Sequence, residues 1–159
     1  MAATLDNSQI LDHLESELRR FIIKRISSVK NWESTCIPAE IRTDASERLK
    51  RAQNMDDILN KPSYTLMDYV NFDAYMRIMI RRDNWRNHFE DVFVVKNVFE
   101  YKMTVIQSLR NDIRHGRRLD PVNKIRLRLH CYDILAQIYE TERPKTFRHS
   151  KLAKKLGLV

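Results

Sequence analysis

Apolar residues recur at spacings of three and four along most of the chain, which is the period of an amphipathic helix. The first such stripe predicts a helix from about Asn7 or Ser8 to about Ser28, with a short polar side chain capping its start. The apolar face of this helix consists of Ile10, Leu14, Leu18, Phe21, Ile22 and Ile26. We expect Trp32, in the segment that follows, to cover the core from a loop.

The middle of the chain predicts three more helices, separated by one proline-containing connection. The first is polar and rich in arginine, and it runs from Pro38 to about Asn54. Residues 55–63 form the connection, because the proline within them cannot occupy a helix interior. Beyond it, a run of aromatic residues predicts helices at about Phe72–Arg81 and Trp85–Phe93. Aromatic side chains beside basic ones can stack on bases, but this helical spacing favours core packing.

The last third of the chain predicts two long helices. The first starts near Lys96, and Gly116 is expected to end it by adopting a positive φ. Its apolar face consists of Phe99, Met103, Ile106, Leu109 and Ile113. The second has Asp120 as its N-cap and Pro121 as its first residue. Its apolar stripe is the most regular in the sequence and comprises Val122, Ile125, Leu129, Tyr132, Ala136 and Tyr139.

These elements predict an all-α protein, an antiparallel bundle of about five to seven helices. A length of 159 residues suits a single domain, which we place at residues 1–142, followed by a basic tail at 143–159 that is either a short helix or disordered. Two glycines and four prolines leave long uninterrupted segments, which favours helices over short strands. No apolar run of about twenty residues and no secretory signal occur. We therefore expect a cytoplasmic protein that does not enter membranes.

Positive charge is concentrated near the end of the chain. Residues 1–100 carry 15 Lys and Arg against 16 Asp and Glu, whereas residues 101–159 carry 14 against 5. Such a bias indicates a polyanionic partner, either nucleic acid or an anionic membrane surface, although basic tails can also serve only as soluble ends.

One segment of this basic third combines titratable and cationic groups densely enough to form a site, namely RNDIRHGRR at residues 110–118. On a helix, Asn111 and His115 share a face, while Arg110 and His115 are about 140° apart. The arginine side chain is long enough to curl toward the histidine face. Arg110 and His115 could therefore reach the same phosphate.

This pair suits RNA cleavage by the substrate's own 2′-hydroxyl. His115 could take or donate a proton as general acid or base, and Arg110 could stabilise the charge of the pentacovalent transition state. Such a mechanism requires neither a metal nor a cofactor. The more frequent role of a histidine and arginines in a last helical turn is structural, since they interact favourably with the helix dipole and the terminal carbonyls.

The string SLRNDIRHGRRL resembles the Arg-x4-6-His signature of HEPN domains, in which a polar residue follows the arginine and the motif closes a core helix. The preceding segments FIIKRISSVKNWEST and YVNFDAYMRIMIRRDNWRNHFEDVF agree with it, because the Swt-type branch has an early tryptophan and a Trp-Phe-Phe helix at similar distances. The resemblance covers about residues 8–140. Arg114 departs from the pattern, since related sequences usually have a small residue there.

The resemblance implies a HEPN-like helical domain that forms a homodimer with two Arg/His pairs in one composite cleft. It further implies a metal-independent endoribonuclease in a toxin, phage-defence or RNA-processing context, in some cases paired with an antitoxin or a larger assembly. Arg110 is then the phosphate stabiliser, His115 the acid and base, and Asn111 a polar orienting residue. The neighbouring cations that would bind RNA are Arg114, Arg117 and Arg118.

Two alternatives remain open at this point. The domain could be a catalytically inactive HEPN module that binds RNA or a nucleotide, or that pairs larger assemblies. It could also be a basic nucleic-acid binder unrelated to HEPN. A metal site has no support, because the other histidines show no ligand spacing and neither cysteine belongs to a CxxC pair.

Overall fold

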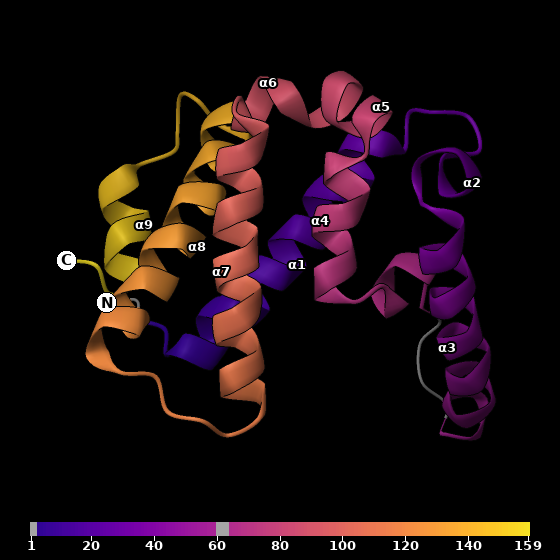
Figure 1. The fold of residues 1–159 in the computed structure, drawn as a ribbon, viewed down its shortest axis with the longest axis horizontal. Coiled ribbons are helices and arrows are strands. Elements are labelled where there is room, and N and C mark those ends of the chain that lie inside the picture. Colours follow the sequence, from indigo (N-terminus) through magenta and orange to yellow (C-terminus); the bar gives the residue numbers. More distant parts are fainter. Residues whose placement is uncertain (1–2, 60–63) are drawn as a thin grey trace. The chain divides into compact units, whose positions relative to one another are not determined.

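The computed structural model describes residues 3–59 and 64–159, with the backbone alone at residues 56–58. Every regular element of these residues is helical and none is a strand (Figure 1). The prediction of an all-α protein is confirmed. The long helices are α1 (Asn7–Ile26), α3 (Ala39–Ile58), α7 (Lys96–Arg114) and α8 (Pro121–Glu142). The shorter elements are α2 (Trp32–Cys36), the 3-10 turn η1 (Leu66–Tyr69), α4 (Phe72–Ile80), α5 (Arg82–Asn84), the π-helical turn η2 (Trp85–Phe89), α6 (Glu90–Phe93) and α9 (His149–Lys155).

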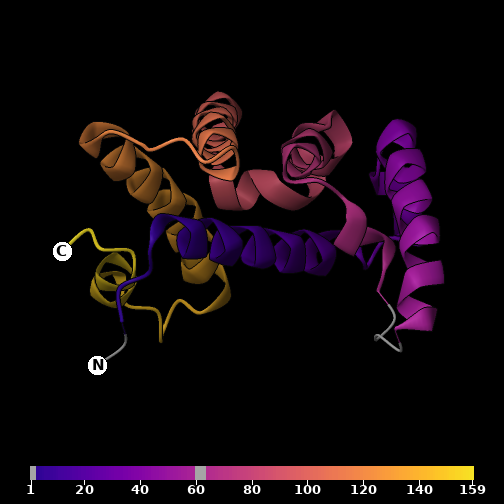
Figure 2. The same cartoon turned by 90° about the horizontal axis from the view of Figure 1, so that it is seen from below.

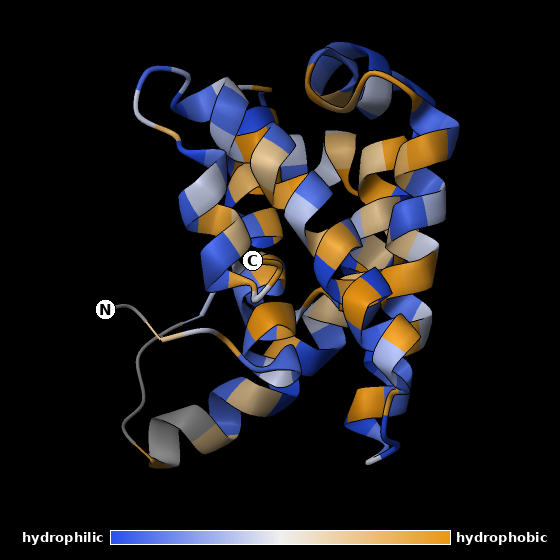
Figure 3. Ribbon diagram, turned by 90° about the vertical axis from the view of Figure 1, so that its left-hand side faces the viewer, coloured by the Kyte–Doolittle hydropathy of each residue, from blue (hydrophilic) through white to orange (hydrophobic). Residues whose placement is uncertain are grey.

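The helices form two compact units. Unit 1 contains residues 1–18 and 89–159, and unit 2 contains residues 19–88. Hydrophobic and hydrophilic residues alternate around the helices of both units (Figure 3), as expected where one face of each helix packs against a core. None of the described helices is long and apolar enough to cross a membrane.

In unit 1, α7 packs against α8, and α6 contacts both of them. The basic segment 143–159, for which helix and disorder were both open, contains α9. Leu152 of this helix and Leu156, its C-cap, are buried. Figure 2 shows α9 beside α8 and beside the residues that lead into α1. The amide of Leu5 donates to the carbonyl of Lys155, with 3.0 Å between N and O. The chain terminus is therefore part of this packed unit.

The first helix follows the sequence prediction closely. All six residues of its predicted apolar face are fully buried, and each buried leucine, isoleucine or phenylalanine contributes roughly 1.5–3 kcal/mol of hydrophobic stabilisation. Its cap is Asp6, one residue before the predicted Asn7. Asp6 accepts a hydrogen bond from the amide of Gln9, and the Gln9 side chain accepts one from the amide of Asp6. This reciprocal pair is a capping box, which satisfies two amides that the helix leaves unbonded.

The prediction for α8 was wrong about the buried face. Val122 and Ile125 are each 61% exposed and Leu129 is 46% exposed, although Ala136 and Tyr139, in the second half of the stripe, are buried. The core is instead formed by the opposite stripe, which comprises Leu127, Cys131, Ile134, Leu135 and Ile138. The error arose because α8 is apolar on two faces, and periodicity alone does not tell which face meets α7. In α7 the predicted face is buried, except that Ile113 is only half-buried.

In and next to unit 2, the structure differs from the sequence prediction at three places. Trp32 is not in a loop but is the first residue of α2, and it is half-buried. The helix expected at Trp85–Phe93 begins earlier, at Arg82, and is interrupted by the π-helical turn η2. Residues 55–58 of the expected connection belong to α3, so this helix ends later than predicted, and residues 60–63 lie outside the described residues.

Asn84 is the one buried polar residue found in the described part of the chain, at 3% exposure. Its side-chain amide donates two hydrogen bonds, to the carbonyl of Cys36 and to that of Ile78, both at 2.7 Å. The amide therefore ties α2 to the end of α4 and satisfies two carbonyls that have little access to water.

We expect Asn84→Ala to lower the free energy of unfolding by about 1–3 kcal/mol, since it removes a donor from two buried carbonyls. Urea denaturation followed by circular dichroism measures this loss. Asn87 is exposed on the same segment, so Asn87→Ala should change the free energy by less than about 0.5 kcal/mol. Equal losses in the two variants would contradict the assigned role of Asn84.

Candidate functional site

The segment that resembles the HEPN signature lies at the end of α7. His115 is the C-cap of this helix, and Gly116 follows with a φ of +72°. The amide of Gly116 donates to the carbonyl of Ile113, and the amide of Arg117 donates to that of Asp112. These two bonds form a Schellman motif, which requires a positive φ at the glycine position. The predicted helix stop at Gly116 is confirmed.

Arg110 points toward the first half of α1. Its guanidinium pairs with the carboxylate of Glu15, with 3.3 Å between Nη2 and Oε2. The two side chains are only 22% and 20% exposed, so water screens this pair weakly. Arg110 is therefore held in place by a carboxylate as well as by its own helix.

Arg114, one turn further along α7, makes a parallel contact. Its guanidinium pairs with Asp12 at 2.5 Å, but these side chains are 41% and 63% exposed. Because Arg110 pairs with Glu15 and Arg114 with Asp12, α1 and α7 run in opposite directions where they meet. Spacings of three residues in α1 and four in α7 place each set of charges on one helix face.

The remaining predicted residues lie toward solvent. Arg117, just beyond the end of α7, pairs with Asp112 of that helix at 2.9 Å, and Arg118 is exposed in the connection to α8. Asn111 is exposed, and its side-chain oxygen Oδ1 accepts a hydrogen bond of 3.3 Å from Nε2 of Gln107. The amide of Asn111 is thus oriented by a residue one turn earlier in α7.

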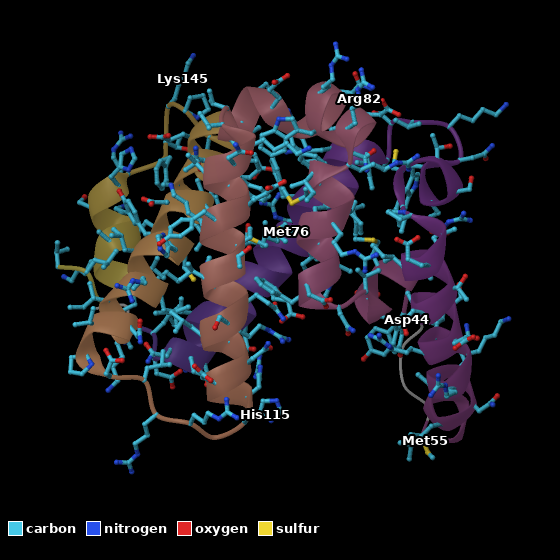
Figure 4. The ribbon with its side chains drawn as sticks, in the orientation of Figure 1. Asp44, Met55, Met76, Arg82, His115 and Lys145 are labelled. Atoms are coloured by element: carbon cyan, nitrogen blue, oxygen red, sulfur yellow. The ribbon has the colours of Figure 1, made fainter. Side chains whose placement is uncertain are left out.

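His115 is exposed at the end of α7, where Figure 4 shows it on the outside of the fold. Within the residues that the structure describes, no hydrogen bond joins His115 to Arg110. The structure thus brings Arg110 and Arg114 against α1 and leaves His115, Arg117 and Arg118 accessible. In a single chain the two groups proposed for catalysis do not share a partner.

Two cavities lie away from this segment. One, in unit 2, is lined by Trp32, Arg42 and neighbouring residues. The other, in unit 1, has a volume of about 390 Å³ and lies where α1, α8 and α9 meet. Its residues include His13, Tyr139 and Lys155, none of which was predicted to belong to a site. The signal in the sequence was the basic segment 143–159, which was interpreted only as a tail, either a short helix or disordered.

Metal binding finds no support in the described residues, since no three His, Cys, Asp or Glu side chains are grouped closely enough to hold an ion. Cys36 and Cys131 are both buried and free. Burial raises the pKa of the Cys131 thiol to about 12, which keeps it protonated and unreactive at neutral pH.

No family model matches the sequence, and the searches of curated proteins and of solved structures gave no match either. Inference about function therefore depends on the geometry of residues 110–118 and on their resemblance to the HEPN signature.

We expect Arg110→Ala to destabilise the fold more than Arg114→Ala does. Removing Arg110 leaves Glu15 mostly buried without this cation and should cost about 1–2 kcal/mol, between the values for exposed and fully buried pairs. The exposed pair of Arg114 should contribute less than about 0.5 kcal/mol. Thermal and urea denaturation of both variants measure the difference. Losses of equal size would show that the Arg110 pair is screened as strongly as the surface one.

Proposed function

We propose that this chain is a HEPN-type homodimer that cleaves RNA without a metal, using Arg110, Asn111 and His115. One observation carries the proposal: the turn that resembles the HEPN signature leaves His115 exposed beside Arg117 and Arg118, one turn beyond Arg110. An imidazole accessible to solvent among cations is suited to act on a phosphate ester. The same arrangement fits an RNA-processing, toxin or phage-defence protein that acts with an antitoxin or a larger assembly.

The proposed reaction is an internal transesterification. His115 accepts the proton of the 2′-hydroxyl while that oxygen forms a bond to phosphorus. The bond from phosphorus to the 5′-oxygen breaks, and the leaving oxygen takes a proton from a protonated histidine or from water. Arg110 stabilises the additional negative charge of the transition state, and Asn111 orients the phosphate. The products carry a 2′,3′-cyclic phosphate and a 5′-hydroxyl.

The ion pairs at the surface near the end of α7 are weak, so the arginines that form them remain available to bind RNA. Exposed pairs such as Arg114 with Asp12 and Arg117 with Asp112 contribute only about 0–1 kcal/mol each. RNA phosphates can replace these carboxylates at little cost, and Arg118 is exposed in the same region. These three arginines would hold the backbone of the RNA, while Arg110 and His115 act on one linkage.

The dimer is supported by apolar residues that the chain leaves uncovered. Val122, Ile125 and Leu129 are exposed on α8, directly after the connection that carries Arg117 and Arg118. A second copy packed on this stripe would bury apolar surface that a monomer exposes to water. It would also bring the two signature turns close together, so that Arg110 of one copy could meet His115 of the other.

A second candidate function is RNA binding without cleavage. The Arg110 guanidinium is already paired with a mostly buried carboxylate, and a phosphate would have to displace Glu15 to reach it. If this exchange does not occur, the domain binds RNA through its basic residues with a steep dependence on salt, and the RNA stays intact.

We expect the wild-type chain to cleave single-stranded RNA in the presence of EDTA, and His115→Ala and Arg110→Ala each to lower the rate by at least a factor of about 100. Gel analysis with mapping of the product ends measures this. His149→Ala removes another exposed histidine and should leave the rate unchanged. Products with 3′-hydroxyl ends, or activity that EDTA abolishes, would contradict the mechanism. Intact RNA bound at low salt would select the second candidate.

We expect Leu129→Glu to convert the dimer to a monomer, because a carboxylate replaces an apolar side chain in the proposed contact. Light scattering after size exclusion measures the mass, and the cleavage rate should fall together with the dimer fraction. Met55→Glu introduces the same charge at another exposed apolar residue, which lies on α3, and should leave both unchanged. A wild-type monomer that cleaves RNA would contradict the composite site.

A further inference from the structure

The cavity of about 390 Å³ in unit 1 lies at the meeting point of three helices. His13 and Glu17 come from α1, Tyr139 from α8, and Lys151 and Lys155 from α9. The remaining lining residues are Arg143, Thr146, Phe147, Arg148 and Leu152. A volume of this size lies within the range of small-ligand sites. None of these residues belongs to the signature segment at the end of α7.

The cavity carries a strong excess of positive charge. Four lining side chains are cationic, at Arg143, Arg148, Lys151 and Lys155, and a single one, Glu17, is anionic. In the part of the chain that the structure describes, Arg143, Lys151 and Lys155 form no ion pair with a carboxylate. Elsewhere in unit 1, Arg110 and Arg114 are each neutralised by α1. The cavity therefore attracts an anion that the protein itself does not supply.

Aromatic rings form one wall of the cavity. The rings of Tyr139 and Phe147 lie 5.8 Å apart between centroids, and the guanidinium of Arg143 lies 4.2 Å above the Tyr139 ring. Tyr139 is buried, whereas Phe147 is half-buried and accessible from the cavity. Aromatic rings and arginine planes of this kind stack on nucleobases.

The imidazole of His13 contacts two polar groups that line the cavity, the Lys155 ammonium and the Tyr139 hydroxyl. The Lys155 ammonium can only donate, so Nε2 of His13 accepts from it at 3.4 Å and also meets the Tyr139 hydroxyl at 3.1 Å. Burial, together with the charge of Lys155, lowers the pKa of His13. A neutral histidine thus positions the ammonium without neutralising its charge.

From this combination we propose that the cavity binds a nucleoside 5′-phosphate, either as a free nucleotide or as the 5′ end of an RNA. Lys151, Lys155 and Arg148 would hold the phosphate, and the base would stack against Phe147. A terminal phosphate carries close to two negative charges at neutral pH, whereas an internal phosphodiester carries one, so the excess of cations favours a terminal group. The proposal does not rest on cleavage by Arg110 and His115.

Calorimetry with the full chain tests the proposal. The ligands are the four ribonucleoside 5′-monophosphates, inorganic phosphate, and two eight-nucleotide 2′-O-methyl RNAs that differ only in a 5′-phosphate or a 5′-hydroxyl. The 2′-O-methyl group removes the nucleophile of the proposed cleavage reaction, so a failure of that function leaves this measurement intact. We expect the 5′-phosphorylated RNA to bind at least tenfold more tightly than its 5′-hydroxyl counterpart.

Comparing the affinities of the monophosphates and of the 5′-phosphorylated RNA distinguishes a free nucleotide from an RNA 5′ end as the ligand. Monophosphates that bind as tightly as the phosphorylated RNA identify the nucleotide alone as sufficient, and a tenfold advantage of the RNA identifies its 5′ end. Equal affinity for both RNAs, or no binding by any phosphorylated ligand at millimolar concentration, overturns the proposal. Inorganic phosphate that binds as tightly as the nucleotides overturns the role of the aromatic wall.

Variants locate the site. Lys151→Ala combined with Lys155→Met removes two charges and keeps an unbranched side chain at the half-buried Lys155, and it should weaken binding at least tenfold. Phe147→Leu should weaken nucleotide binding several-fold while leaving the affinity for inorganic phosphate unchanged. Lys145 points outward from the same segment (Figure 4) and does not line the cavity, so Lys145→Ala serves as the matched control. Unchanged affinity in the lysine double variant, with helical content intact by circular dichroism, overturns the proposal.

Discussion

Charge compensation between the first helix and the last third of the chain is the interaction on which unit 1 depends. Residues 101–159 carry 14 basic side chains and only 5 acidic ones, so carboxylates from elsewhere in the chain lower the repulsion between them. The first half of α1 supplies them, with Glu15 against Arg110 and Asp12 against Arg114. Hydrophobic burial drives the helices together, and these pairs allow the basic helix α7 to lie against α1.

The same compensation decides where the chain is open to an anion. It is nearly complete at Arg110, which is mostly buried with its partner. Charge compensation is incomplete around the cavity between α1, α8 and α9, because Glu17 is the single carboxylate among the four cationic side chains that line it. The signature turn lies between these extremes, with surface pairs at Arg114 and Arg117 and with Arg118 and His115 exposed. An RNA could therefore engage the accessible arginines before it competes for Arg110.

The Arg110 pair gives the two candidate functions a common physical basis. A phosphate that displaces Glu15 gains a charge-assisted contact with a guanidinium, but it leaves a mostly buried carboxylate to find another partner. Dimerisation would favour the phosphate over Glu15, since a second copy packed on the apolar stripe of α8 would exclude water from residues 110–118 of both copies and strengthen the contact with the phosphate. The two candidate functions, cleavage of RNA and binding without cleavage, thus differ in whether a phosphate displaces Glu15 from Arg110. The same fold supports both.

Local patterns in the sequence determined most of the helices. The stripe of α1, the positive φ of Gly116 and the cap at Asp120 each depend on neighbours within about four residues, and all three occur as predicted. The cluster from Arg110 to Arg118 was visible for the same reason.

Tertiary structure decided what local patterns leave open. The sequence of α8 offers two apolar faces, and only packing against α7 and α6 determined that Leu127 and Ile134 are buried while Ile125 is exposed. The partner of Arg110 is 95 residues away in the sequence, and His13 meets Lys155 across 142 residues. Contacts at such separations depend on how whole helices pack, and no spacing within a single helix encodes them.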